Sequence, residues 1–245
     1  MKVGKYYRNR EECCISGGTG CGVVYLSGCD MHCAYCLVYD ISQEGKGVPY
    51  TPRQLAELLC SLQQRGVSHI SLANVEPSAD EVIEAVAIAR ELGLTVPLLN
   101  NFNGYAPTAF TRRLQPFFQG YIMDFKYADA ALGAHLSAAP DYPRRALANL
   151  ALLSAHYGNN RYDAAGLLQS GVLLRHLILP GMWRNTEDAL RLIAANNPSG
   201  YPLSLLPDFV PEGRTADVLH PPYAVSPQRL HQLTELAHSL GLELI

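Results

Sequence analysis

The decisive stretch of this sequence is GVVYLS at residues 22–27, which runs directly into GCDMHCAYC at residues 28–36. The first part is a short apolar run with β-branched and aromatic residues, which is typical of a buried strand. The second part contains Cys29, Cys33 and Cys36 within a single predicted loop. The sequence therefore predicts a strand that delivers the chain into a loop of three thiol ligands.

Three thiolates on one loop can hold three irons of a cubane cluster and leave the fourth iron without a protein ligand. A zinc site is the alternative, for which a Cys-x-x-Cys is usually paired with a second Cys or His pair. No such second pair is present, and His32 lies between the ligands. We therefore interpret Cys29, Cys33 and Cys36 as ligands of a 4Fe-4S cluster.

The other cysteines carry a different pattern. The chain has 7 cysteines, and all but Cys60 lie before residue 37, which argues for reduced thiols rather than a disulfide framework. Cys13, Cys14 and Cys21 lack a regular ligand spacing, and we interpret them as small buried thiols.

Strand and helix patterns alternate along the rest of the chain. Thr51 and Pro52 begin a helix that Gly66 ends, and Ser78 with Glu81 forms a capping box for the next helix, which Gly93 closes. Strands are predicted at 22–27, 67–73, 95–99, 120–125, 171–179 and 202–206, with further helices near 108–116, 143–157, 186–196 and 226–240.

This order of elements predicts an α/β fold. Strands that are each followed by a helix imply parallel pairing through right-handed crossovers, with functional groups at the carboxyl ends of the strands. Six strands are too few for a closed eight-stranded barrel, so we predict a partial (β/α)6 TIM-like barrel, although a doubly wound sheet gives the same order. We expect a single domain over 1–245, with 1–21 as an N-terminal extension and 22–245 as the partial barrel.

Composition and charge restrict the partners. The chain of 245 residues is 48% apolar with a net charge of −3, and its Lys and Arg residues are scattered, so we expect no nucleic-acid and no membrane partner. The N-terminus is polar and no apolar run is long enough to span a bilayer, which predicts a cytoplasmic protein.

The cysteine motif carries a family resemblance. Cys-x-x-x-Cys-x-x-Cys after a first strand, with Tyr35 before the last cysteine, resembles the signature of the radical S-adenosylmethionine (SAM) superfamily. The chain is similar to the pyruvate formate-lyase activating enzyme-like subgroup, on these stretches: EE at 11–12 with CISG at 14–17, ISQEG at 41–45, DFKY at 124–127, APDY at 139–142 and RHLILPG at 175–181.

The resemblance implies a fold, cofactors and a reaction. It implies a radical SAM partial barrel with a 4Fe-4S cluster that reductively cleaves S-adenosyl-L-methionine to a 5′-deoxyadenosyl radical. That radical abstracts a hydrogen atom from a peptide, a protein glycine or a small molecule, after an electron donor such as flavodoxin or ferredoxin has reduced the cluster. The resemblance assigns no catalytic residue.

The resemblance also implies residues that contact SAM. Tyr35 lies against the adenine through its backbone. Glu76 belongs to Asn74-Val75-Glu76-Pro77, where the family has Gly-Gly-Glu/Asp-Pro, and contacts the methionine amino group. Asn101 and Asn103 match positions that approach the ribose or the methionine part.

Charged residues at later strands complete this set. Asp124 and Lys126 end the fourth predicted strand and Arg175 and His176 lie in the fifth, where the family's basic groups hold a carboxylate. Asp208 follows the sixth strand, where the family often has glutamine, and is expected to face the substrate.

Three functional alternatives remain open. The protein is an activase of a glycyl-radical enzyme, a radical enzyme acting on a peptide or small metabolite, or, from another class, a non-catalytic iron-sulfur electron carrier or zinc-binding module. Leu37-Val38 replaces the family's Gln-Asn after the third cysteine, which makes the wall beside the cluster more apolar.

Overall fold

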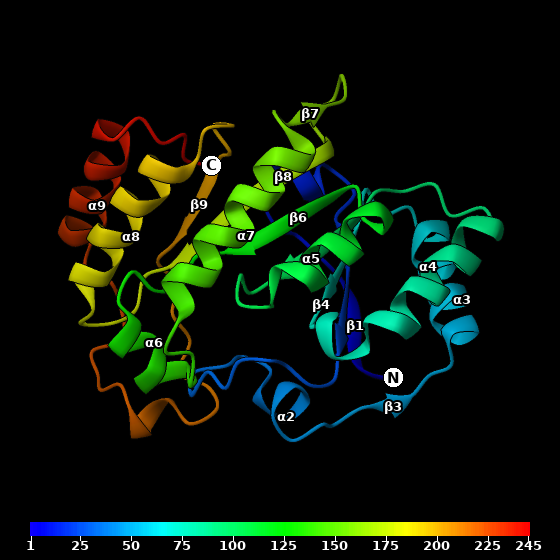
Figure 1. The fold of residues 1–245 in the computed structure, drawn as a ribbon, viewed down its shortest axis with the longest axis horizontal. Coiled ribbons are helices and arrows are strands. Elements are labelled where there is room, and N and C mark those ends of the chain that lie inside the picture. Colours follow the sequence, from blue (N-terminus) through cyan, green and yellow to red (C-terminus); the bar gives the residue numbers. More distant parts are fainter.

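The fold is a mostly parallel sheet with helices on its outer side (Figure 1). The computed structural model describes residues 1–245. The strand order is β3-β1-β2-β4-β5-β6-β8-β7, with β9 paired to β8. The parallel strands are β2 (Cys21–Leu26), β4 (Ile70–Ala73), β5 (Leu98–Phe102), β6 (Gly120–Asp124), β8 (Leu168–Leu177) and β9 (Leu203–Leu206), while β1 (Lys2–Asn9), β3 (Val48–Pro49) and β7 (Arg161–Tyr162) pair antiparallel. This arrangement confirms the predicted partial barrel.

The helices lie between these strands along the chain. They are α1 (Cys13–Ser16), α2 (Tyr39–Ser42), α3 (Pro52–Gln64), α4 (Ala79–Glu91), α5 (Thr108–Leu114), α6 (Ala130–Ser137), α7 (Tyr142–Tyr157), α8 (Trp183–Asn196) and α9 (Pro227–Ser239), with short 3-10 turns η1 (Glu76–Ser78), η2 (Gln115–Phe117) and η3 (Thr215–Asp217). None of the helices is long and apolar enough to cross a membrane.

The structure confirms one of two predicted caps at helix starts and contradicts the other. At α3, the Thr51 side chain accepts from the amide of Gln54 at 3.2 Å and the Gln54 side chain accepts from the amide of Thr51 at 2.9 Å, which is the expected capping box. At α4, Ser78 makes no such bond. The predicted Ser78–Glu81 box is wrong because Ser78 is the last residue of η1 and lacks the extended backbone that an N-cap needs.

The N-terminal segment is part of the sheet. Residues 1–21 were expected to form an extension, but β1 pairs antiparallel with β2 along most of its length, and α1 follows it. Ile15 of α1 packs inside the barrel against Leu99, Ile122 and Leu173. The lower layer of the barrel interior is therefore filled by an apolar cluster, and open space is left at the carboxyl ends of the strands.

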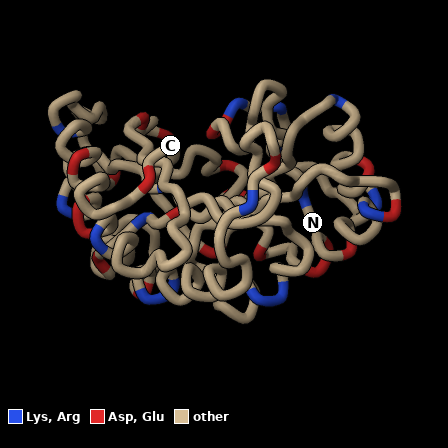
Figure 2. Tube along the Cα trace, turned by 90° about the horizontal axis from the view of Figure 1, so that it is seen from above, with Lys and Arg blue, Asp and Glu red and all other residues tan.

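Charge is distributed over the surface without a large patch of one sign. Figure 2 shows Lys and Arg segments interspersed with Asp and Glu segments around the molecule. This pattern fits the net charge of −3.

Candidate cluster and cofactor site

A cavity of about 310 Å³ opens at the carboxyl ends of the parallel strands. Because side chains alternate along a strand, only every second residue of each strand reaches it. The strand ends contribute Tyr25, Ala73, Asn101, Asp124, Arg175, Leu177 and Leu206, and the cysteine loop contributes Cys33, Cys36, Leu37 and Val38. The cavity therefore joins the predicted ligand loop to the polar ends of the strands.

Backbone hydrogen bonds hold the cysteine loop from two sides. The amides of His32 and Ala34 donate to the carbonyls of Ser137 and Leu136 at 3.0 and 2.9 Å, at the carboxyl end of α6. A third bond comes from the C-terminal part of the chain, where the amide of Arg214 donates to the carbonyl of Ala34 at 2.6 Å. These bonds fix the loop without using its thiols.

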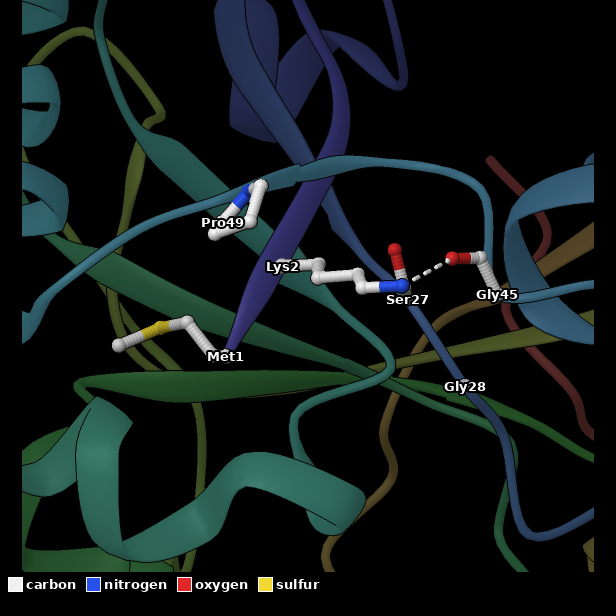
Figure 3. A pocket seen from close by; sticks show the side chains of 6 residues that line it. All are labelled: Met1, Lys2, Ser27, Gly28, Gly45 and Pro49. Atoms are coloured by element: carbon white, nitrogen blue, oxygen red, sulfur yellow. Dashed lines mark hydrogen bonds between the residues drawn. The ribbon is translucent and has the colours of Figure 1, made fainter.

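The start of the loop is held by the segment that leads to β3. Ser27 donates its hydroxyl to the carbonyl of Lys46 at 2.7 Å, and Lys2 of β1 donates to the carbonyl of Gly45 at 3.1 Å. Figure 3 shows Lys2, Ser27 and Gly45 around a separate cavity that Gly28 also lines and that none of the cysteines lines. This second cavity belongs to the scaffold of the loop.

Each thiol of the motif faces a polar neighbour. Asn103 donates its amide to Cys29 Sγ at 3.5 Å, Ser137 donates its hydroxyl to Cys33 Sγ at 3.0 Å, and Cys36 Sγ lies 3.2 Å from the Ser42 hydroxyl. Burial raises the pKa of Cys29 and Cys33.

The three thiols do not form a preassembled group of metal ligands in the cofactor-free chain. Their number, type and spacing nevertheless fit a cluster held by three cysteines, since the loop contains no fourth cysteine. Positive iron close to the sulfurs offsets the burial that raises their pKa, since a coordinating thiol is deprotonated outright.

Glu76 is buried beside the cysteine loop. It lines the main cavity and also a smaller one of about 230 Å³ that Cys29 and Asp30 share. Burial, and then the charge of Asp30, raises the pKa of Glu76 to about 7. Its only side-chain hydrogen bond comes from the Asn100 amide at 3.4 Å.

Asn74 takes the place of the first family glycine in the turn before Glu76. Its φ of 60° lies in the left-handed region, which asparagine tolerates better than most residues. Its side-chain amide donates to the carbonyl of Leu26 at 3.1 Å. The turn therefore keeps a glycine-like backbone without the glycine.

The two predicted asparagines on β5 and just after it both lie at the cavity. Asn103 donates to Asp30 Oδ1 at 2.6 Å, which ties the end of β5 to the cysteine loop. Asn101 lines the cavity wall and makes no side-chain hydrogen bond within the chain, so its amide is free for a ligand.

Asp124 and Lys126 form an ion pair at the cavity wall, with Lys126 Nζ 2.5 Å from Asp124 Oδ2. Burial acts to lower the pKa of Lys126, but the charge of Asp124 outweighs it and the pKa is raised. Lys126 is therefore a cation at neutral pH, positioned close to Cys33.

Arg175 reaches the cavity but is already engaged. Its guanidinium bonds Glu12 Oε1 at 2.8 Å and Oε2 at 2.5 Å, and Glu11 at 3.1 Å. Burial opposes charge on Glu12, but the hydrogen bond and charge of Arg175 hold the pKa of that carboxyl below its ordinary value. The predicted carboxylate clamp is thus occupied by the protein's own acids, which separate the cavity from the apolar layer below.

His176 points away from the cavity. It is fully buried on the outer face of β8, with Nδ1 2.6 Å from the Phe125 carbonyl and Nε2 3.0 Å from the Thr186 hydroxyl. Strand alternation explains the difference: if Arg175 faces inward, its neighbour faces outward. The structure does not bring His176 to the site. The sequence could have shown this, because adjacent residues of a strand face opposite sides.

Tyr35 and Asp208 occupy opposite environments. The Tyr35 ring is buried against Phe209 and its hydroxyl lies 2.6 Å from that of Tyr127, so its side chain belongs to the core while its backbone belongs to the cysteine loop. Asp208 is exposed at the cavity mouth. Sequence reasoning missed the contacts of Asp30, Tyr127 and Ser137 with this site, because polar residues of these kinds are common in loops and helix ends.

Comparisons with known proteins agree with this geometry. Residues 16–121 match the family model described as "4Fe-4S single cluster domain". An uncharacterized protein of Methanocaldococcus jannaschii is 20% identical over 91% of this chain and 63% of its own length, so the chain spans less than two thirds of this curated relative.

Solved structures share the fold. Streptococcus suis SuiB bound to S-adenosylmethionine is 11% identical, with a TM-score of 0.62 over 91% of this chain and 49% of that chain. HydG, an FeFe-hydrogenase maturase from Carboxydothermus hydrogenoformans, is 11% identical, with a TM-score of 0.60 over 91% of this chain and 52% of that chain. The structure titled "Native anSMEcpe with bound AdoMet" gives a TM-score of 0.58 at 11% identity over 89% of this chain and 62% of that chain.

The matched residues 16–121 include the loop of Cys29, Cys33 and Cys36. The chain thus has a 4Fe-4S cluster-domain match over residues 16–121 and shares the fold of SuiB and anSMEcpe, both of which are solved with S-adenosylmethionine bound. A 4Fe-4S cluster and S-adenosyl-L-methionine are the cofactors that the resemblance in the sequence implies for this chain.

Proposed function

We propose that this protein is an enzyme that cleaves S-adenosylmethionine reductively and abstracts a hydrogen atom from a peptide, a protein glycine or a small molecule. The observation that carries the proposal is the single cavity in which the loop of Cys33 and Cys36 meets Glu76, Asn101 and Lys126. An electron carrier or a zinc module has no use for such a polar cavity beside its metal.

Different residues of the site have different roles in binding the cluster and S-adenosylmethionine. Cys29, Cys33 and Cys36 hold the cluster, which when bound supplies the electron that breaks the sulfonium of S-adenosylmethionine. Glu76 is buried, accepts from Asn100, and holds the amino group of the methionine part. Asn101 offers its free amide to the ribose or the methionine part, and Lys126 offers a cation to the carboxylate. Asn103 lies beside them with its amide bonded to Asp30 and Cys29, and approaches the same part of the cofactor as a wall of the cavity.

The cavity has an apolar side beside the cysteine loop. Leu37, Val38 and Leu206 line it, so a bound nucleoside would meet apolar surface there. Fixing the reacting atoms at short distance converts hydrogen abstraction into an effectively unimolecular step. Arg175 remains in the wall as a partner of Glu12 and Glu11 rather than as a ligand contact.

The class of substrate is the finer part of the proposal. The similar protein anSMEcpe has been solved with bound AdoMet and the Cp18Cys peptide, which supports a peptide substrate for this fold. The resemblance to activating enzymes supports a protein glycine instead. Asp208 is exposed at the mouth of the cavity, where either substrate approaches, and we assign it to the substrate side.

The test is formation of 5′-deoxyadenosine. The protein is purified without oxygen, reconstituted with iron and sulfide, and incubated with S-adenosylmethionine and dithionite, and the product is measured by chromatography. We expect 5′-deoxyadenosine from wild type and from Cys60→Ala, a matched cysteine variant outside the loop, and none from Cys33→Ala. An intact cluster without cleavage, even with candidate peptides, contradicts the proposal and favours the electron carrier; a zinc-containing, iron-free protein favours the zinc module.

A further inference from the structure

A continuous chain of buried hydroxyl groups ends on Cys33. The Tyr35 hydroxyl lies 2.6 Å from that of Tyr127, the Tyr127 hydroxyl lies 2.5 Å from Ser137 Oγ, and Ser137 Oγ lies 3.0 Å from Cys33 Sγ. Tyr127 and Ser137 are fully buried, and Tyr35 nearly so. These three hydroxyl groups are therefore shielded from solvent, so water does not replace them as hydrogen-bond partners of one another.

The proton count fixes the direction of this chain. A thiolate that ligates iron can only accept, so Ser137 must donate its single hydroxyl proton to Cys33 Sγ. Ser137 Oγ then accepts from Tyr127, and Tyr127 in turn accepts from Tyr35, which is the terminal donor. Because each donation polarises the next hydroxyl, hydrogen bonds in such a chain strengthen one another.

The backbone keeps Ser137 in place. Its carbonyl accepts from the amide of His32 at 3.0 Å, while its hydroxyl reaches Cys33 in the same loop. Ser137 is the last residue of α6, and the next residue, Ala138, ends the helix with a φ of 51°. One residue thus supports the loop by its main chain and the sulfur by its side chain.

Hydrogen bonds to cluster sulfurs raise the reduction potential, because they stabilise the more negative reduced state. We propose that Ser137 is a positioning residue that donates to Cys33 Sγ under the control of Tyr127 and Tyr35 and thereby raises the midpoint potential of the cluster. The inference deepens the proposed function, since it rests on the cluster at Cys33, but it does not depend on cleavage of S-adenosylmethionine.

The test is the midpoint potential of the reconstituted cluster, followed by electron paramagnetic resonance during anaerobic titration. Ser137→Ala removes the donor and keeps the backbone bond to His32, so we expect a more negative potential, by up to about tenfold in the equilibrium of reduction, or ~59 mV for one electron. Tyr127→Phe leaves Ser137 without its donor and gives a smaller shift of the same sign, and Tyr35→Phe the smallest.

Ser71→Ala is the matched control, since Ser71 is a fully buried serine on β4 whose hydroxyl has no partner in the chain. We expect wild-type potential from it. If Ser137→Ala fails to take up iron, the shifts of Tyr127→Phe and Tyr35→Phe decide. Unchanged potentials in the tyrosine variants and in any loaded Ser137→Ala, or an equal shift in Ser71→Ala, overturn the inference, and so does a wild type that takes up no cluster. A wild type that binds the cluster and shows the graded shifts but forms no 5′-deoxyadenosine contradicts only the proposed function.

Discussion

The two ends of the barrel each hold cysteines, and their surroundings differ. At the carboxyl ends of the strands, Cys29 and Cys33 face amide and hydroxyl donors beside an open cavity. In the layer below, Cys14 and Cys21 lie in a closed apolar cluster with Ile15, where burial raises the pKa of both thiols. The same residue type is therefore a ligand candidate at one end and a core residue at the other, and its position on the strands decides which.

The largest expected effect separates these two sets of cysteines. Cys29→Ala, Cys33→Ala and Cys36→Ala each remove one of three cluster ligands, so we expect complete loss of the iron-sulfur absorbance and of bound iron after anaerobic reconstitution. Cys14→Ala and Cys21→Ala should retain wild-type iron content. Equal loss of iron from both sets would show that the position of a cysteine on the strands does not decide whether it is a ligand.

The second prediction concerns the buried ion pairs of Arg175, which lie between the cavity and the apolar layer. Arg175→Ala leaves Glu11 and Glu12 buried without their partner, and we expect a loss of about 3–5 kcal/mol in the free energy of unfolding of the cofactor-free chain, measured by denaturant titration. Arg191→Ala removes an exposed pair with Asp188 and should cost at most about 1 kcal/mol. Similar values for the two variants would mean that the buried pair does not separate the layers as described.

The outer face of β8 supplies a pH test. Burial lowers the pKa of His176 from 6.5 to about 4 in the folded chain. Between these values the unfolded chain binds a proton that the folded chain does not. The contribution of neutral His176 to the free energy of unfolding is therefore fully present above pH 6.5 and is lost as the pH falls toward 4. The contribution is roughly 3 kcal/mol. Unfolding free energies of wild type and His176→Gln across this range should converge as the pH falls; parallel curves would place His176 in contact with solvent.

The smallest effect is expected within the apolar layer. Cys21→Ala removes one buried sulfur and should cost about 1 kcal/mol of stability, while Cys21→Ser buries a hydroxyl among apolar side chains and should cost more. Thermal unfolding of the cofactor-free variants ranks the two. A Cys21→Ser variant as stable as wild type would show that this layer is polar or open to water.

Much of the fold was predictable because its signals are local. Thr51, Pro52 and Gly66 mark the ends of α3 through capping chemistry, and the apolar run at 22–27 marks β2. β1 was missed because it is an antiparallel strand with mostly exposed side chains and no clean alternation. Cys13, expected to be buried, is exposed, since a helix of one turn buries only one side.

The site was predictable only in part, because strand ends show which residues are near but not what they bond. The sequence placed Glu76, Asn101, Asn103, Asp124 and Lys126 at strand ends, where the structure has them. The sequence could not show that Arg175 pairs with Glu12, since the two residues are 163 positions apart and meet only in the folded chain. The contact between Ser137 and Cys33 is equally long-range.

We propose that the cysteine loop holds a 4Fe-4S cluster with one iron open to S-adenosylmethionine. The most direct measurement is the electron paramagnetic resonance spectrum of the dithionite-reduced, reconstituted protein before and after S-adenosylmethionine is added. We predict the signal of a reduced 4Fe-4S cluster that changes when S-adenosylmethionine binds. A cluster signal that is unaltered by saturating S-adenosylmethionine, or a protein that holds zinc and gives no signal, would contradict the account.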